Sequence, residues 1–275
     1  MLKTAPYTGR RGTYRTGLKF ATVGFARNIE KKYFDKTYQA LSAESLTGQY
    51  SNFRTNNGVM YISGPWQKYN FGGQSNGDNT TTSNDMLKGL KTGTDARSRI
   101  GNKINVKYIK GAFTFTAASL NVTGTNLDVP QGGESGIFNS TNGQYYLRTT
   151  FRWMVVKDLQ VNSTDAQLTW NQVMDSNVQT AGIHSELNVD NMGRFVVLED
   201  RLITVDADDP QKTVQFMVNS SKIGSVRYNG PSDVALTDKG IYVIWAAFVM
   251  GAVVEANNIA CSSPVGHSRM CFTDD

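Results

Sequence analysis

RSRIGNKINVKYIKGAFTFTA, residues 97–117, is the stretch that decides the fold class of this chain. It contains no proline and no helical spacing of apolar side chains. About twenty consecutive residues favour an extended chain, whereas an ordinary strand has about 5 to 6. We therefore predict one unusually long strand here, and a protein in which long strands are useful.

The apolar side of this strand changes partway along. Apolar residues occupy even positions from Ile104 to Tyr108 and odd positions from Phe113 to Ala117. Because side chains alternate strictly across a sheet, a switch of this kind needs a bulge or a sharp bend. Glycine tolerates such a distortion, so we expect it at Gly111.

Other extended segments lie on both sides of this stretch. Residues 145–157 (YYLRTTFRWMVVK) alternate as a half-buried strand does. Further strands are expected at residues 25–39, 59–63, 194–206, 213–218, 223–228 and 241–250.

One segment, residues 163–175 (STDAQLTWNQVMD), favours a short helix instead, because Thr164 and Gln167 form a capping box ahead of an apolar face. About eight antiparallel strands with one short helix predict an all-β fold. Its form is a single jelly-roll, an eight-stranded two-sheet antiparallel sandwich with long loops.

Composition agrees with one large β domain. The chain has 275 residues with 26 Gly and 6 Pro, and charged residues make up 19%. Two polar stretches, residues 70–85 and 128–142, read as long exposed loops on the outer surface. The chain opens without the apolar region of a signal peptide. The longest apolar run, residues 241–254, is shorter than the roughly 18 to 20 residues of a membrane helix, so we expect a buried strand and no membrane partner.

Positive charge is concentrated at the start of the chain. Residues 1–19 carry five basic residues and no acidic one, and residues 20–36 carry four basic against two acidic. The remaining 239 residues hold 19 basic against 21 acidic residues, a net charge of −2. A solvated terminus that happens to be basic would explain this pattern. The alternative is a basic N-terminal arm, residues 1–19, that meets a polyanion and precedes a domain of residues 20–275.

Catalytic chemistry is not evident in the sequence, and we expect no enzyme, cofactor or metal. His184 and His267 are expected in separate surface loops, and neither has a partner at catalytic spacing. The acidic run at residues 206–209 could bind Ca²⁺, but a turn ahead of Pro210 explains it more simply. Glu199 and Asp200 lie on opposite faces of a strand and cannot share a substrate. Two cysteines, at positions 261 and 271, are too few for a disulfide scaffold.

Five blocks of sequence, in order, carry a resemblance to a known family. They are IEKKYFD (residues 29–35), LKTGTDARSRIGNKINVKYIKGAF (90–113), LRTTFRWMVVKDLQVN (147–162), RFVVLEDRLITVD (194–206) and VRYNG (226–230). Together they resemble the capsid proteins of circular, Rep-encoding single-stranded DNA viruses, the circovirus-like group. The similarity covers most of the chain.

The resemblance implies a jelly-roll subunit that self-assembles into a small icosahedral shell of about 60 copies. The shell would package circular single-stranded DNA through sequence-independent phosphate contacts, in a virion assembled in the host nucleus, with a host-cell receptor that the resemblance does not identify. The basic arm would face the lumen and be partly flexible, although it is shorter and less arginine-rich than such arms usually are. The expected nucleic-acid contacts are Lys3, Arg10, Arg11, Arg15, Lys19, Arg27, Lys31 and Lys32.

A second class of function remains open. A jelly-roll binding module of lectin type, not of viral origin, would also have long loops and no catalytic groups. It would have no need to place its positive excess within the first 36 residues, and this favours the capsid. A hydrolase on a β-sandwich would need paired acids that we do not find.

Overall fold

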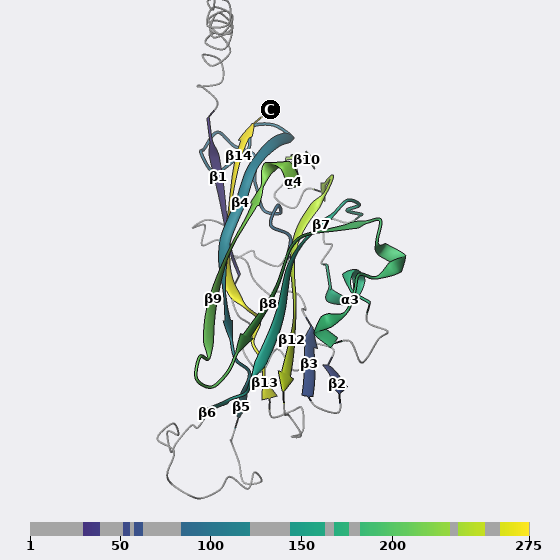
Figure 1. Ribbon diagram of the computed structural model, residues 1–275. Helices are drawn as coiled ribbons and strands as arrows, with labels where there is room; N and C mark the ends of the chain where they lie inside the picture. The colour runs from purple at the N-terminus through teal and green to yellow at the C-terminus, as the bar shows by residue number, and fades with distance from the viewer. Residues whose placement is uncertain are drawn as a thin grey trace, which may run out of the picture.

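The computed structural model describes residues 30–38, 52–55, 58–62, 84–121, 144–162, 168–175, 182–231, 236–250 and 259–274. Most of these residues form antiparallel strands, arranged in two large sheets and one small one (Figure 1). The small sheet joins β13 (Ile259–Ala260), β5 (Ser119–Asn121) and β6 (Gln144–Tyr146).

The first sheet is built around one long strand. β4 (Lys103–Thr116) pairs on one edge with β14 (Val265–Asp274), which pairs in turn with β1 (Lys32–Tyr38). Two strands share the other edge of β4. They are β9 (Gln211–Asn219) and β10 (Ser225–Asn229), with the short α4 (Ser220–Ile223) between them in the chain. β11 (Leu236–Thr237) extends the sheet beyond β10.

The second sheet is centred on the apolar strand β12 (Gly240–Met250). On one side of it lie β3 (Gly58–Ile62) and then β2 (Asn52–Thr55). On the other side lie β7 (Thr149–Asp158) and then β8 (Phe195–Val205). β12 covers all of the predicted strand at residues 241–250, which is therefore confirmed.

The chain passes between the two sheets in the order of a jelly roll. It visits β1 in the first sheet, β3 in the second, β4 in the first, β7 and β8 in the second, β9 in the first, β12 in the second and β14 in the first. The resulting spatial orders are β1-β14-β4-β9 and β3-β12-β7-β8. Eight strands in two antiparallel sheets with this connection confirm the predicted fold class.

The long strand confirms one prediction and corrects another. β4 has 14 residues, more than twice an ordinary strand, although it begins at Lys103 and not at residue 97. Its apolar side does switch, but the bulge lies at Lys107, where the ladder with β14 passes from Tyr108 to Val106. Gly111 is required for a different reason: a Cβ there would collide with the His267 carbonyl oxygen and lie 2.8 Å from the Phe216 ring.

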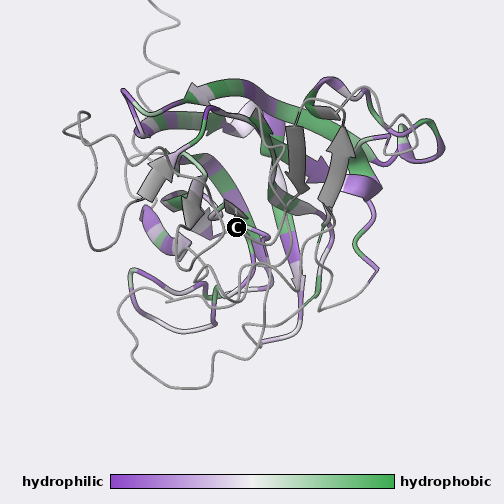
Figure 2. Ribbon diagram, turned by 90° about the horizontal axis from the view of Figure 1, so that it is seen from below, coloured by the Kyte–Doolittle hydropathy of each residue, from purple (hydrophilic) through white to green (hydrophobic). Residues whose placement is uncertain are grey.

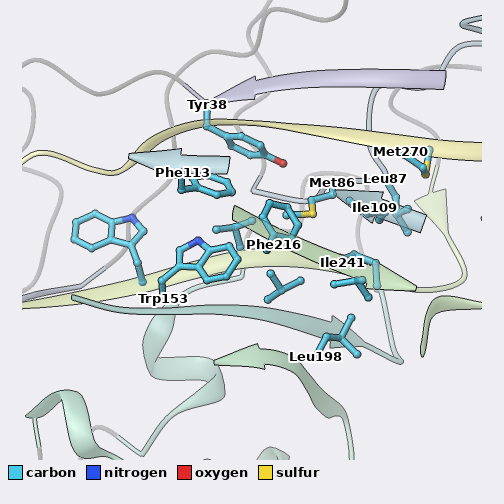
Figure 3. Close-up of a cluster of buried hydrophobic side chains, with 14 of the residues drawn as sticks. Tyr38, Met86, Leu87, Ile109, Phe113, Trp153, Leu198, Phe216, Ile241 and Met270 are labelled. Carbon is cyan, nitrogen blue, oxygen red and sulfur yellow. The ribbon is translucent and has the colours of Figure 1, made fainter. Parts of the chain in front are cut away.

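An aromatic core fills the space between the sheets. Phe113 of β4 lies with its ring centroid 5.4 Å from that of Trp153 on β7, and Trp153 lies 5.2 Å from Phe216 of β9. Figure 3 shows these rings meeting between the two layers, with Tyr38 of β1 above Phe113. Figure 2 shows the cause, because bands of hydrophobic and hydrophilic residues alternate along the strands.

A second apolar cluster covers the outer side of the second sheet. Met154 and Ile244, which point away from the core, pack beneath Trp170 and Val173 of the short helix α3 (Trp170–Val173). Figure 1 shows this covering layer on the side of β7 and β12 that faces away from the first sheet. A helix does occur within the predicted segment: Thr169 is its N-cap, and the Thr169 backbone N–H donates to the Gln172 side chain at 3.0 Å. The predicted capping box of Thr164 and Gln167 lies outside the described residues.

Candidate nucleic-acid interface

Among the described residues, no apolar cluster covers the outward face of the first sheet as one does on the second, although Cys271 is buried there. The outward residues form rows across the strands. One row runs through Tyr33 of β1, Cys271 of β14 and Tyr108 of β4. The next row places Asp35, Arg269, Lys110 and Met217 side by side on β1, β14, β4 and β9. A third row holds Thr37, His267, Ala112 and Gln215.

Basic residues outnumber acidic ones on this face. The outward positions of β1, β4, β9, β10 and β14, together with the bulge, carry a single carboxylate, Asp35. They carry five basic residues: Lys103, Lys107, Lys110, Arg227 and Arg269. We call this set, with the rows above, the basic face. Because several cations lie on one face of a sheet, the basic face is suited to a polyanion.

The one carboxylate on the basic face is already paired. Arg269 Nε and Nη2 donate to the two Asp35 oxygens at 2.6 and 2.8 Å. This hydrogen-bonded arginine holds the pKa of Asp35 below its usual value, so the carboxylate stays ionised and tied to Arg269. Lys107 and Lys110 are exposed and form no ion pair with the other described residues.

A hollow of about 960 Å³ lies within the basic face. Arg269 and His267 of β14, Lys110 and Ala112 of β4, and Gln215 and Met217 of β9 line it. Arg201 reaches the hollow from β8 across the edge of the sandwich, and its Nη1 donates to the Gln215 carbonyl oxygen at 2.8 Å. The hollow is therefore built from both sheets.

The outward charges of the second sheet are neutralised by one another. Arg152 of β7 forms two hydrogen bonds with Asp200 of β8, at 3.0 and 2.7 Å. Arg194 forms a similar pair with the buried Asp158, at 2.9 and 2.7 Å. Within the described residues the two broad faces of the sandwich thus differ: an apolar cluster and paired charges lie on one, and unpaired basic side chains lie on the other.

The predicted site residues fall in three groups. Six of them, Lys3, Arg10, Arg11, Arg15, Lys19 and Arg27, lie outside the described residues, as does the whole predicted arm. Lys31 is exposed immediately before β1, and its role stays a prediction.

Lys32 requires a correction. Its side chain is 1% exposed, lies 2.9 Å from Asp274 Oδ2 and donates to the Ser98 carbonyl oxygen at 3.0 Å. Even-numbered residues of β1 point into the sandwich, so Lys32 is not available to a phosphate.

The basic face itself was not predicted. Three of its lysines, at positions 103, 107 and 110, lie within the stretch that predicted the long strand, on its polar side. The alternation of these lysines with apolar residues could have predicted a basic outward side of the strand. Arg227 and Arg269 give no such signal, because only the strand registers bring them beside β4.

Other predictions about chemistry can be examined in the described residues. They contain no group of three His, Cys, Asp or Glu placed to hold a metal. Asp206 accepts from the backbone N–H groups of Asp208 and Asp209, both at 3.1 Å, as expected of an acidic turn. Both histidines are exposed, but His267 lies in β14 and not in a loop. Both cysteines are buried and free. The helices in this part of the chain are too short or too polar to span a bilayer.

Comparisons with known proteins give little similarity. No protein-family model matches the chain, and no curated protein matches it in sequence. Among solved structures, the chain is similar to the VP1 pentamer of human polyomavirus 6, with 10% identity over 90% of this chain and 94% of that chain and a TM-score of 0.16. A TM-score this low does not establish a common fold, so the fold class rests on the strand order and registers.

Proposed function

We propose that this protein is the subunit of a small icosahedral viral shell of about 60 copies that packages circular single-stranded DNA. The jelly roll is one of the folds used by viral capsid proteins, and also by lectins and cupins, so the fold alone does not choose among these functions. The observation that carries the proposal is the contrast, within the described residues, between the basic face and the opposite face with its apolar cover and paired charges.

A shell subunit has an inner and an outer surface, and the different chemistry of the two sheet faces suits that role. A subunit that encloses nucleic acid needs cations on the side toward the cargo, because each phosphate carries a negative charge. In this proposal the basic face looks into the lumen, on the same side as the basic arm. Long strands suit the same role, since at about 3.3 Å per residue they give a slab wide enough to reach several neighbours.

Charge arithmetic also favours a contribution from the sheet. Five arm charges on about 60 copies offset about 300 phosphates, which is fewer than a whole viral genome would contain. Lys32 is buried and cannot add to this total. Cations of the basic face, among them Lys107 and Lys110, are the source that we propose for part of the remainder.

The test is direct. The full-length chain is expressed, purified and imaged by negative-stain electron microscopy, and its nucleic acid is extracted and digested with DNase or RNase. We expect closed shells of uniform size that contain DNase-sensitive, single-stranded material. A chain that stays monomeric by light scattering at high concentration and moderate salt would overturn the proposal. A small oligomer that binds glycans and carries no nucleic acid would redirect it to a lectin-like module.

A further inference from the structure

The hollow in the basic face has a floor and a rim of different chemistry. Ala112 occupies the middle of its row, where the small side chain leaves the sheet surface low. Met217 borders it on β9 and is 51% exposed, so it offers an apolar contact. The rim carries the cations of Lys110, Arg201 and Arg269 together with the carboxylates of Asp35 and Glu199.

The three rim cations differ in whether they already bind a carboxylate or a backbone group of the protein. Arg269 is tied to Asp35, and Arg201 lies 3.6 Å from Glu199 while also bonding to the β9 backbone. Lys110 makes no ion pair with any described residue, and its Nζ lies 5.6 Å from the centre of the Tyr108 ring. A further anion at this rim would therefore be held first by Lys110.

The ligand that fits this arrangement has a flat apolar part, polar edges and a negative charge. Its flat part would lie over Ala112 and Met217, and its edges would reach the side chains of Gln215 and His267, which also line the hollow. A volume of about 960 Å³ is within the range of about 300 to 1,000 Å³ that small-molecule sites occupy. A nucleotide has all three properties.

We propose that this hollow holds one unpaired nucleotide, with the base over Ala112 and the phosphate beside Lys110. The base must be unpaired, because a duplex keeps its bases stacked inside and presents phosphates to a sheet surface. The inference rests on the proposed function and adds to it a site where a single strand is distinguished from a duplex. A nucleotide in a strand and a free nucleotide share this chemistry, and the experiment separates them.

The experiment uses full-length protein freed of nucleic acid at high salt, with a fluorescent eight-residue oligothymidylate and a duplex as probes in anisotropy titrations. Ala112→Leu fills the hollow and changes no charge. It should weaken single-strand binding about fivefold or more and leave duplex binding unchanged. Lys110→Gln should also weaken binding and should lower the salt-dependence slope by about 0.7, the value for one phosphate contact on a single strand.

Two matched controls accompany these variants. Thr114→Leu places the same leucine side chain at the next outward position of β4, outside the hollow, and should have no effect on either probe. Lys107→Gln removes a cation outside the hollow and should weaken binding of single strand and duplex alike. Urea midpoints of all variants confirm that each one folds.

Two results would overturn the inference: equal single-strand affinity of Ala112→Leu and the wild type, or equal losses on both probes. With the Ala112→Leu effect present, competition by millimolar thymidine monophosphate identifies the free nucleotide as a ligand, and lack of competition assigns the hollow to a continuous strand. The same variants are imaged for shells. If the wild type forms shells but Ala112→Leu binds single strands normally, only the nucleotide site in the hollow is refuted. If the wild type forms no shells, the proposed function is refuted.

Discussion

Lys36 is a charged residue in the interior of the sandwich. Its side chain is 1% exposed, and its Nζ donates to the Asp85 backbone carbonyl. Asp85 is buried as well, and its Oδ1 accepts from the backbone N–H groups of Leu87 and Ile241 at 2.9 and 3.1 Å. The other charged group facing Lys36 is Lys88, which opposes its protonation. Burial lowers the pKa of Lys36 from 10.5 to about 7, and the Asp85 carboxylate only partly offsets this effect.

We predict that this lysine makes stability depend on pH. Between about pH 7 and 10.5 the unfolded chain holds a proton on Lys36 that the folded chain has lost. The free energy of unfolding should therefore rise with pH in this window, by at most about 1.4 kcal/mol per unit. Urea midpoints measured from pH 7 to 8 test this. Over this range the Cys261 thiol stays mostly protonated in the unfolded chain, where its ordinary pKa is 9.0, and in the folded chain, where burial raises its pKa to about 12.

The control for this prediction is Lys36→Met, which fills the same space without a titrating group. The stability of this variant should lose most of its rise with pH. What is left belongs to other groups such as the terminal amine and Asp85, whose pKa burial raises, so that Asp85 acts in the opposite direction. Exposed Lys110→Met should keep the wild-type slope. Identical pH dependence in the wild type and Lys36→Met would contradict the prediction.

At the scale of elements, the covering layer on the second sheet depends on one arginine of β7. Besides its pair with Asp200, Arg152 Nη1 donates to the carbonyl oxygens of Ile183 and Ser185 at 2.8 and 2.7 Å. Ile183 lies in η1 (Gly182–His184), which belongs to the same apolar cluster as α3. Arg152 therefore fastens the layer to the sheet.

We predict that Arg152→Ala loosens this layer without unfolding the sandwich. The loss of hydrogen bonds to a charged group should lower the free energy of unfolding by about 2 kcal/mol. Hydrogen exchange should quicken at residues 182–187 and stay unchanged in β4. Arg152→Lys keeps the charge but loses the planar guanidinium. Its free energy of unfolding should lie between those of the wild type and Arg152→Ala. Uniform exchange changes in both sheets would show that the arginine acts on the whole fold instead.

The strands also show which parts of the fold can be predicted from the sequence. Alternation was enough to predict β4 and the two-layer fold, because a half-buried strand must alternate. The bulge was misplaced because Tyr108 counts as apolar, although it lies in the outward row beside Cys271. Ile109 was the informative residue, since it is buried at an odd position, before Gly111. A glycine kept for close packing and one kept for a bend look the same in a sequence.

At the scale of the whole molecule, the basic face could be predicted only in part. The count of charge along the chain included Lys32 and Lys36 in the basic N-terminal segment. Both side chains are buried, however, because the even-numbered residues of β1 point into the sandwich. Lys110, Arg201 and Arg269 are far apart in the sequence and meet only because β14 and β9 flank β4 and β8 lies at the adjoining edge. Pairing between distant strands is not encoded in local periodicity.

The arm and the basic face should contribute to packaging separately. Deleting residues 1–19 removes five positive charges per subunit, and the triple variant Lys107→Gln, Lys110→Gln, Arg227→Gln removes three. On about 60 copies these losses correspond to about 300 and about 180 phosphates.

We expect both variants to form shells with a lower ratio of absorbance at 260 nm to that at 280 nm. The deletion should lose more nucleic acid than the triple variant, and the combined variant should lose roughly the sum. Arg148→Gln, a change outside the basic face, should package normally. If the triple variant packaged as much as the wild type while the deletion packaged little, the arm alone would hold the cargo and the open sheet would need another explanation.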